Sequence, residues 1–115
     1  MLLPTIAACI TGVIGLVNFF HPRLMLAPMQ IQLDSPLAVS EARGVFGGMN
    51  LAMAAAALGL NSAEVYTALG IGWGGVLLAR FWSLAVDNIG IKMSLPAIIL
   101  DGGLCFLFLS PVLLG

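Results

Sequence analysis

Charged residues are scarce in this chain: four Lys or Arg and five Asp or Glu make up 8% of its 115 residues. Ordinary soluble domains carry about 25%. With a formal net charge of −1, the sequence offers no basic patch for nucleic acid and no polybasic segment for anionic lipid. The sequence therefore predicts neither a nucleic-acid-binding protein nor a water-exposed globular domain.

The residue patterns of metal sites and of common catalytic motifs are also missing. The two cysteines, Cys9 and Cys105, form no CxxC pair and have no spacing to histidine that suits a metal. We interpret them as small apolar core residues, with a disulfide as the alternative. One histidine with scattered carboxylates is a weak basis for acid–base catalysis, and no nucleophile elbow or phosphate-binding glycine loop is present. We therefore expect a protein that is not an enzyme and that has no cofactor.

What the chain has in abundance is long apolar runs, at about residues 3–20, 39–59, 64–86 and 93–113. A helix of about 20 apolar residues spans the roughly 30 Å of hydrocarbon in a bilayer. No Lys or Arg precedes Arg23, so the first run lacks the positive start of a cleaved signal peptide and is expected to be retained, with a signal anchor as the alternative. The sequence predicts an all-α membrane protein, with four transmembrane helices in one antiparallel bundle over residues 1–115.

Local signals mark where these helices begin. Ser35 is a suitable N-cap with Pro36 at the first helical position. Asn61 and Glu64 have capping-box spacing for the third helix, and Ser94 is the expected cap of the fourth. The connections at about 61–63 and 87–92 are short and predict tight hairpins, whereas the first loop, at about 21–38, is long. Its alternation of apolar and polar residues over 29–34 predicts an extended segment on the membrane surface.

The positive charges predict the orientation. The four Lys and Arg residues lie at or near the first and third loops, at Arg23, Arg43, Arg80 and Lys92. By the positive-inside rule these loops face the cytoplasm, and both termini face outward, into the periplasm of a Gram-negative cell. We expect a bacterial inner membrane protein.

Several polar residues fall within the spans, near their cytoplasmic ends. An ionisable group costs about 2.5–3.5 kcal/mol to insert at the centre of a membrane helix, so each of these residues requires an explanation. Arg80 and Asp101 lie at similar depth on adjacent spans, so an ion pair is predicted, with Glu41 or Asp87 as alternative partners of Arg80. The whole predicted cluster comprises His21, Glu41, Arg43, Arg80, Asp87 and Asp101, with Asn18 at the same level. A structural role explains such a cluster most simply. A pocket for a lipid headgroup, a quinone-like molecule or a small anion is the first alternative, and a catalytic or proton-conducting site is the second.

Small residues predict close helix packing. The glycines expected at helix contacts are Gly44, Gly47, Gly48, Gly70 and Gly74, the last two forming a GxxxG motif. We expect these faces to join spans two and three, or to be the docking site of another subunit.

Two motifs carry a resemblance. The segment Glu41–Gly48 reads E-x-R-G-x-x-G-G, and the segment Ala79–Asp87 reads A-R-x-x-S-x-x-x-D. Together they resemble a family of small four-span bacterial membrane proteins that is catalogued as a domain of unknown function; here Ala79 stands where that family has glycine. The resemblance implies the four-helix architecture and suggests importance for Glu41, Arg43, Arg80 and Asp87. It implies no activity.

Three functions follow as hypotheses, of which the third, after the two described next, is a membrane enzyme. The first is a non-catalytic accessory subunit of a larger membrane assembly, of respiratory or photosynthetic type, whose partners are the lipid bilayer and other membrane subunits or further copies of the chain. The second is a carrier or binding protein for a small molecule, quinone or lipid headgroup that uses the polar cluster.

Overall fold

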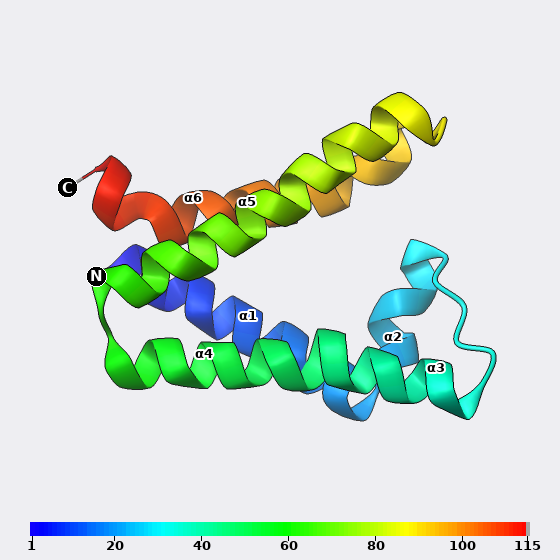
Figure 1. The fold of residues 1–115 in the computed structure, drawn as a ribbon, viewed down its shortest axis with the longest axis horizontal. Helices are drawn as coiled ribbons and strands as arrows, with labels where there is room; N and C mark the ends of the chain where they lie inside the picture. Colours follow the sequence, from blue (N-terminus) through cyan, green and yellow to red (C-terminus); the bar gives the residue numbers. More distant parts are fainter. Residues whose placement is uncertain (115) are drawn as a thin grey trace. The chain divides into compact units, whose positions relative to one another are not determined.

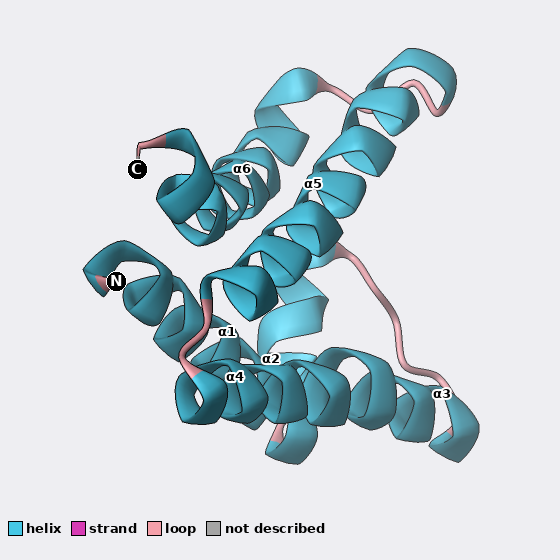
Figure 2. Ribbon diagram, turned by 60° about the vertical axis from the view of Figure 1, so that its left-hand side comes forward, coloured by secondary structure: helices cyan, strands magenta, loops and turns pink. Residues whose placement is uncertain are grey.

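The computed structural model describes residues 1–114, which form helices and loops with no strand among them (Figure 2). In chain order the elements are α1 (Leu2–Phe20), α2 (Pro22–Leu26), a 3-10 turn η1 (Ala27–Met29), α3 (Pro36–Glu41), a π-helical segment η2 (Ala42–Gly48), α4 (Met49–Leu60), α5 (Ala63–Val86) and α6 (Ile91–Leu113).

Four helices are long and apolar enough to cross a bilayer. They are Leu2–Phe20, Pro36–Leu60, Ala63–Val86 and Ile91–Leu113. The second is continuous through α3, η2 and α4. The predicted all-α class and the four spans are thus confirmed, with bounds within about three residues of those expected from the apolar runs.

The second span begins at the N-cap that the sequence predicts, whereas the third and fourth spans begin at other residues. Ser35 caps α3 as predicted, since its hydroxyl accepts a hydrogen bond from the backbone N–H of Ala38 at 3.1 Å. At α5 the cap is Ser62, not Asn61: the Ser62 hydroxyl accepts from the N–H of Val65 at 3.2 Å. Asn61 instead takes the left-handed turn position, with φ of 45°, which asparagine tolerates better than most residues.

The fourth span begins earlier than predicted. Its N-cap is Gly90, so Ser94 lies inside the helix rather than at its start. Pro96 and Pro111 are also within α6. A proline inside a helix removes the N–H that would bond the carbonyl four residues earlier. At Pro111 that carbonyl belongs to Leu107, and the hydroxyl of Ser110 donates to it at 2.8 Å in place of the missing N–H.

The first loop is more ordered than the alternation of its residues predicts. Pro22 opens α2, in a position where its missing N–H costs nothing, and η1 follows directly. The turn ends at Gln30, which has a left-handed φ of 62°. After α2 and η1, residues 30–35 lack helical structure, so extended backbone in the segment expected over 29–34 can begin only after η1.

The chain divides into two compact units. The first unit is Ala8–Leu60, and the second unit combines Met1–Ala7 with the residues from Asn61 onward. In the first unit α1 lies beside the helix formed by α3, η2 and α4, and in the second α5 lies beside α6 (Figures 1 and 2). In each unit the two long helices are antiparallel, because contacts shift toward lower residue numbers on one helix as they rise on the other.

Glycines permit the close approach within the first unit. A Cβ on Gly47 would lie 2.6 Å from the backbone N of Phe19, and one on Gly15 would lie 2.9 Å from the carbonyl oxygen of Gly47. No side chain fits at either position without moving a backbone. Gly48 has only ordinary contacts, and a Cβ on Gly44 would meet no described atom within 4 Å. Gly44 therefore differs from the expectation that it is a packing residue.

In the second unit the GxxxG face of α5 is turned toward α6. A Cβ on Gly70 would lie 2.7 Å from Cγ of Leu109, and one on Gly74 would lie 3.3 Å from Sγ of Cys105. The expectation that the glycine faces join spans two and three is therefore wrong for these residues. Gly47 packs on span one, and Gly70 and Gly74 pack on span four.

Candidate functional site

The ion pair predicted between Arg80 and Asp101 is present in the second unit. Nε of Arg80 donates a hydrogen bond to Oδ2 of Asp101, joining α5 to α6. The Asp101 side chain is 2% exposed and that of Arg80 is 30% exposed. The carboxylate is thus withdrawn from the surroundings and held by a permanent cation, which offsets much of the cost of burying it.

Arg43, expected in the polar cluster with Arg80 and Asp101, instead contacts the backbone of α1. One of its Nη atoms donates to the carbonyl oxygens of Phe19, at 2.5 Å, and Phe20, at 3.1 Å. These carbonyls are at the end of α1, where no following helical N–H remains to bond them. Arg43 therefore caps the C-terminus of α1, and its positive charge also complements the negative end of that helix.

The motif Glu41–Gly48 consists of the last residue of α3 and the whole π-helical segment η2. Its widened turns appear in the hydrogen bond from the N–H of Met49 to the carbonyl of Gly44, five residues back. The amide of Asn50 donates to the carbonyl of Phe46 at 2.9 Å. The segment holds Arg43 and Gly47, which both lie against the end of α1. Neither the apolar pattern nor the capping signals predict the π turns. The sequence feature consistent with them is the presence of three glycines among the seven residues of η2.

The other members of the predicted cluster lie on exposed helix ends. His21 is the residue between α1 and α2, and Glu41 is the last residue of α3; both are exposed in the first unit. Asp87 is exposed at the C-terminus of α5, where its N–H bonds the carbonyl of Ser83. Within residues 1–114 none of these three side chains has a hydrogen bond to protein. Of the predicted cluster, the structure thus brings together Arg80 and Asp101, while Arg43 binds the end of α1.

Sequence reasoning missed a polar contact at the opposite ends of the spans. Tyr66 on α5 is fully buried in the second unit and its ring stacks on Phe108 of α6, with centroids 6.3 Å apart. Its hydroxyl donates to Oδ1 of Asn61 at 2.8 Å and lies 3.4 Å from Oγ1 of Thr5. Tyr66 thereby ties the first turns of α1 and the short hairpin loop to α5. A lone tyrosine near the start of an otherwise apolar span was the signal available.

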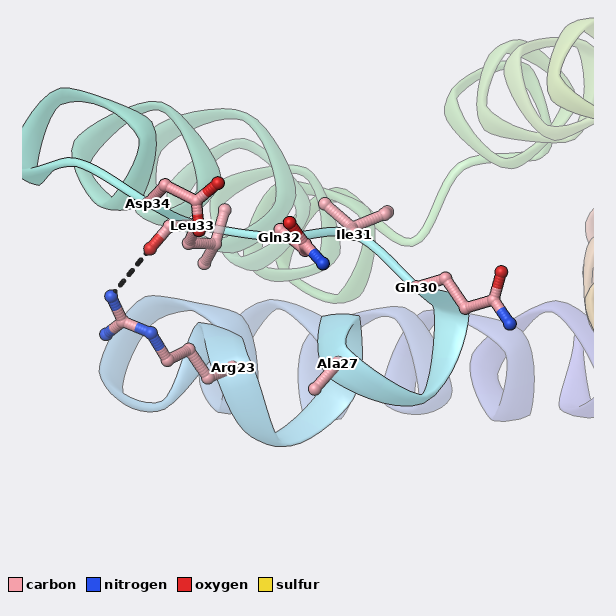
Figure 3. Close-up of a pocket in the computed structure, with 7 residues that line it drawn as sticks. All are labelled: Arg23, Ala27, Gln30, Ile31, Gln32, Leu33 and Asp34. Carbon is pink, nitrogen blue, oxygen red and sulfur yellow. Dashed lines mark hydrogen bonds between the residues drawn. The ribbon is translucent and has the colours of Figure 1, made fainter.

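An open pocket of about 760 Å³ lies in the first unit between α2 and the loop that follows it (Figure 3). Its lining residues are Arg23, Ala27, Gln30, Ile31, Gln32, Leu33 and Asp34. An Nη of Arg23 donates to the carbonyl of Leu33 at 2.8 Å across this pocket. The pocket is distinct in sequence from the predicted cluster.

Metal-ligating side chains are not gathered anywhere in the described chain. No group of three or more His, Cys, Asp or Glu residues in positions 1–114 is placed to hold a metal ion. Cys9 and Cys105 are both free thiols. No family model, curated protein or solved structure matches this chain.

Proposed function

We propose that this chain is a non-catalytic accessory subunit of a larger membrane assembly, of respiratory or photosynthetic type, in a bacterial inner membrane. The proposal includes cytoplasmic first and third loops and outward termini, and membership of the four-span family that its two motifs resemble. The four membrane-length helices make up most of the chain, and they are the surfaces on which we expect the partner subunits to pack.

The observation that carries the proposal is that the two arginines within the spans bind groups of this same chain. Arg80 is bound by Asp101, and Arg43 is bound by the carbonyls at the end of α1. Both contacts hold one helix to its neighbour. Polar groups that bind each other in this way stabilise helix pairs in a bilayer. The side chains that remain exposed on the helices are then largely apolar, as Leu78 and Trp82 are on α5. Apolar faces recognise other helices by shape, which is what a packing subunit requires.

The test is extraction of the tagged chain from its native membrane in a mild detergent, followed by native mass spectrometry. We expect foreign membrane subunits in a fixed ratio to the chain. Because the contact surfaces are apolar, the ratio should be the same in about 0.1 M and about 1 M salt, although the Debye length falls from about 10 Å to 3 Å. A chain recovered alone, or only with copies of itself and a retained small molecule, would contradict the proposal and favour a binding protein.

A further inference from the structure

The pocket in the first loop is built by a closed turn. The N–H of Gln30 bonds the carbonyl of Ala27 at 2.9 Å, and the N–H of Ile31 bonds the carbonyl of Leu26 at 3.1 Å. The Arg23 side chain then spans the turn to the carbonyl of Leu33. Three hydrogen bonds therefore fix the backbone around the pocket, in a segment that follows directly from the end of α1.

Two opposite charges line this pocket without pairing to each other. Arg23 and Asp34 are both lining residues, yet Arg80 with Asp101 is the one ion pair among residues 1–114 (Figure 3). The bond to Leu33 uses a single Nη of Arg23, so Nε and the other Nη retain their hydrogens for a ligand. The amides of Gln30 and Gln32 add neutral donors and acceptors. A cation and an anion in one pocket fit a ligand that carries both charges.

The surroundings of the pocket indicate where the rest of that ligand lies. The pocket begins three residues after the end of α1, a helix of membrane-spanning length, so a bilayer crossed by α1 would have its headgroups beside the pocket. Apolar side chains of the same segment are exposed, with Leu24 at 71% and Met29 at 42%. Exposed side chains of this kind at the end of a span are suited to contact with acyl chains just below the headgroups.

We infer that this pocket binds the headgroup of a phospholipid whose phosphate and primary ammonium are both charged, the phosphatidylethanolamine class. The phosphate lies on the free N–H groups of Arg23, because a guanidinium suits a phosphate geometrically and electrostatically. The ammonium lies on the carboxylate of Asp34 and the glutamine amide oxygens. The site does not depend on the accessory role proposed above, since it is formed by residues 23–34 alone.

The experiment measures lipid selectivity of the purified, delipidated chain after exchange into mixed micelles with equal amounts of phosphatidylethanolamine and phosphatidylglycerol. Phosphatidylglycerol has the phosphate and lacks the ammonium. Native mass spectrometry reports the ratio of the two retained lipids. We expect phosphatidylethanolamine to be favoured roughly tenfold, the ratio that one charged hydrogen bond of about 1.4 kcal/mol produces. Equal retention of the two lipids would overturn the inference.

Variants separate the two charges. Asp34→Asn should lower the ratio to about one while phosphatidylglycerol is retained as before. Arg23→Gln should reduce retention of both lipids, and Arg23→Lys should restore part of it. Lys92→Gln removes an exposed cation outside the pocket and should leave the ratio unchanged. Arg23 also holds Leu33, so Asp34→Asn is the deciding variant, and an unchanged ratio in that variant would overturn the assignment.

A further arm distinguishes a lipid from a soluble ligand of the same chemistry. O-phosphoethanolamine carries both charges and no acyl chain. It should compete with the bound lipid only weakly, because the contacts of Leu24 and Met29 are lost. Tight binding of O-phosphoethanolamine with no lipid retained would overturn the assignment to a membrane lipid.

Discussion

Arg80 holds Asp101 across the two helices of the second unit, and the carboxylate is the more buried of the two groups. The pair predicts a specific pattern of mutant stability. Arg80→Leu or Asp101→Leu alone leaves one charge without its partner and should lower the free energy of unfolding by about 3–5 kcal/mol. The double leucine variant should recover much of that loss, as measured by unfolding in detergent. Additive single effects would mean that the pair contributes no coupling.

Gly47 and Gly44 form a matched pair of variants three residues apart in η2. Gly47→Ala places a Cβ against the backbone of Phe19 and should destabilise the chain by about 1–3 kcal/mol. Gly44→Ala meets no described atom and should be neutral or slightly stabilising, because alanine loses less backbone entropy. Thermal unfolding in detergent measures both. A destabilised Gly44→Ala with an unaffected Gly47→Ala would show that η2 is turned the other way.

Tyr66→Phe removes the hydroxyl and keeps the ring on Phe108. The loss leaves Oδ1 of Asn61 without its donor and should cost about 1–2 kcal/mol. Thr67→Val is the control, since Thr67 bonds only the carbonyl of Ala63 in its own helix. Unfolding in detergent compares the two. Equal effects would mean that the contact to Asn61 adds nothing to stability.

The orientation is tested with reporter fusions. A reporter active only in the periplasm, fused to the C-terminus, should give signal, and one active only in the cytoplasm should not. The same cytoplasmic reporter inserted at Asn88, in the third loop, should be active. The reverse pattern would place the positive loops outside.

The sequence predicted the spans because apolar length is a physical requirement of the bilayer, independent of which neighbour a helix packs against. It also predicted the pairing of Arg80 with Asp101, because two residues at equal depth on helices joined by a short loop have few other partners. Ser62 displaced Asn61 as a cap because both residue types suit the position, and only the chain geometry decides which takes the left-handed turn. The contact of Arg43 with Phe19 and Phe20 joins positions more than twenty residues apart, and no local pattern encodes it.

The π turns in η2 have a consequence for the length of the second span. A π turn is equivalent to one residue inserted into an α-helix, and each residue of an α-helix advances the direction of its side chain by about 100°. Deleting Gly44, which has no close contact, would let the segment close into regular α-helix, and Pro36–Arg43 would keep nearly the same direction relative to Met49–Leu60, because the π turn had absorbed the extra residue. Deleting Ala52 from the regular helix α4 would have no such compensation and would rotate Arg43 relative to Ala54 by about 100°. The π turns therefore allow this span to hold an additional residue while Arg43 and Ala54 both face α1.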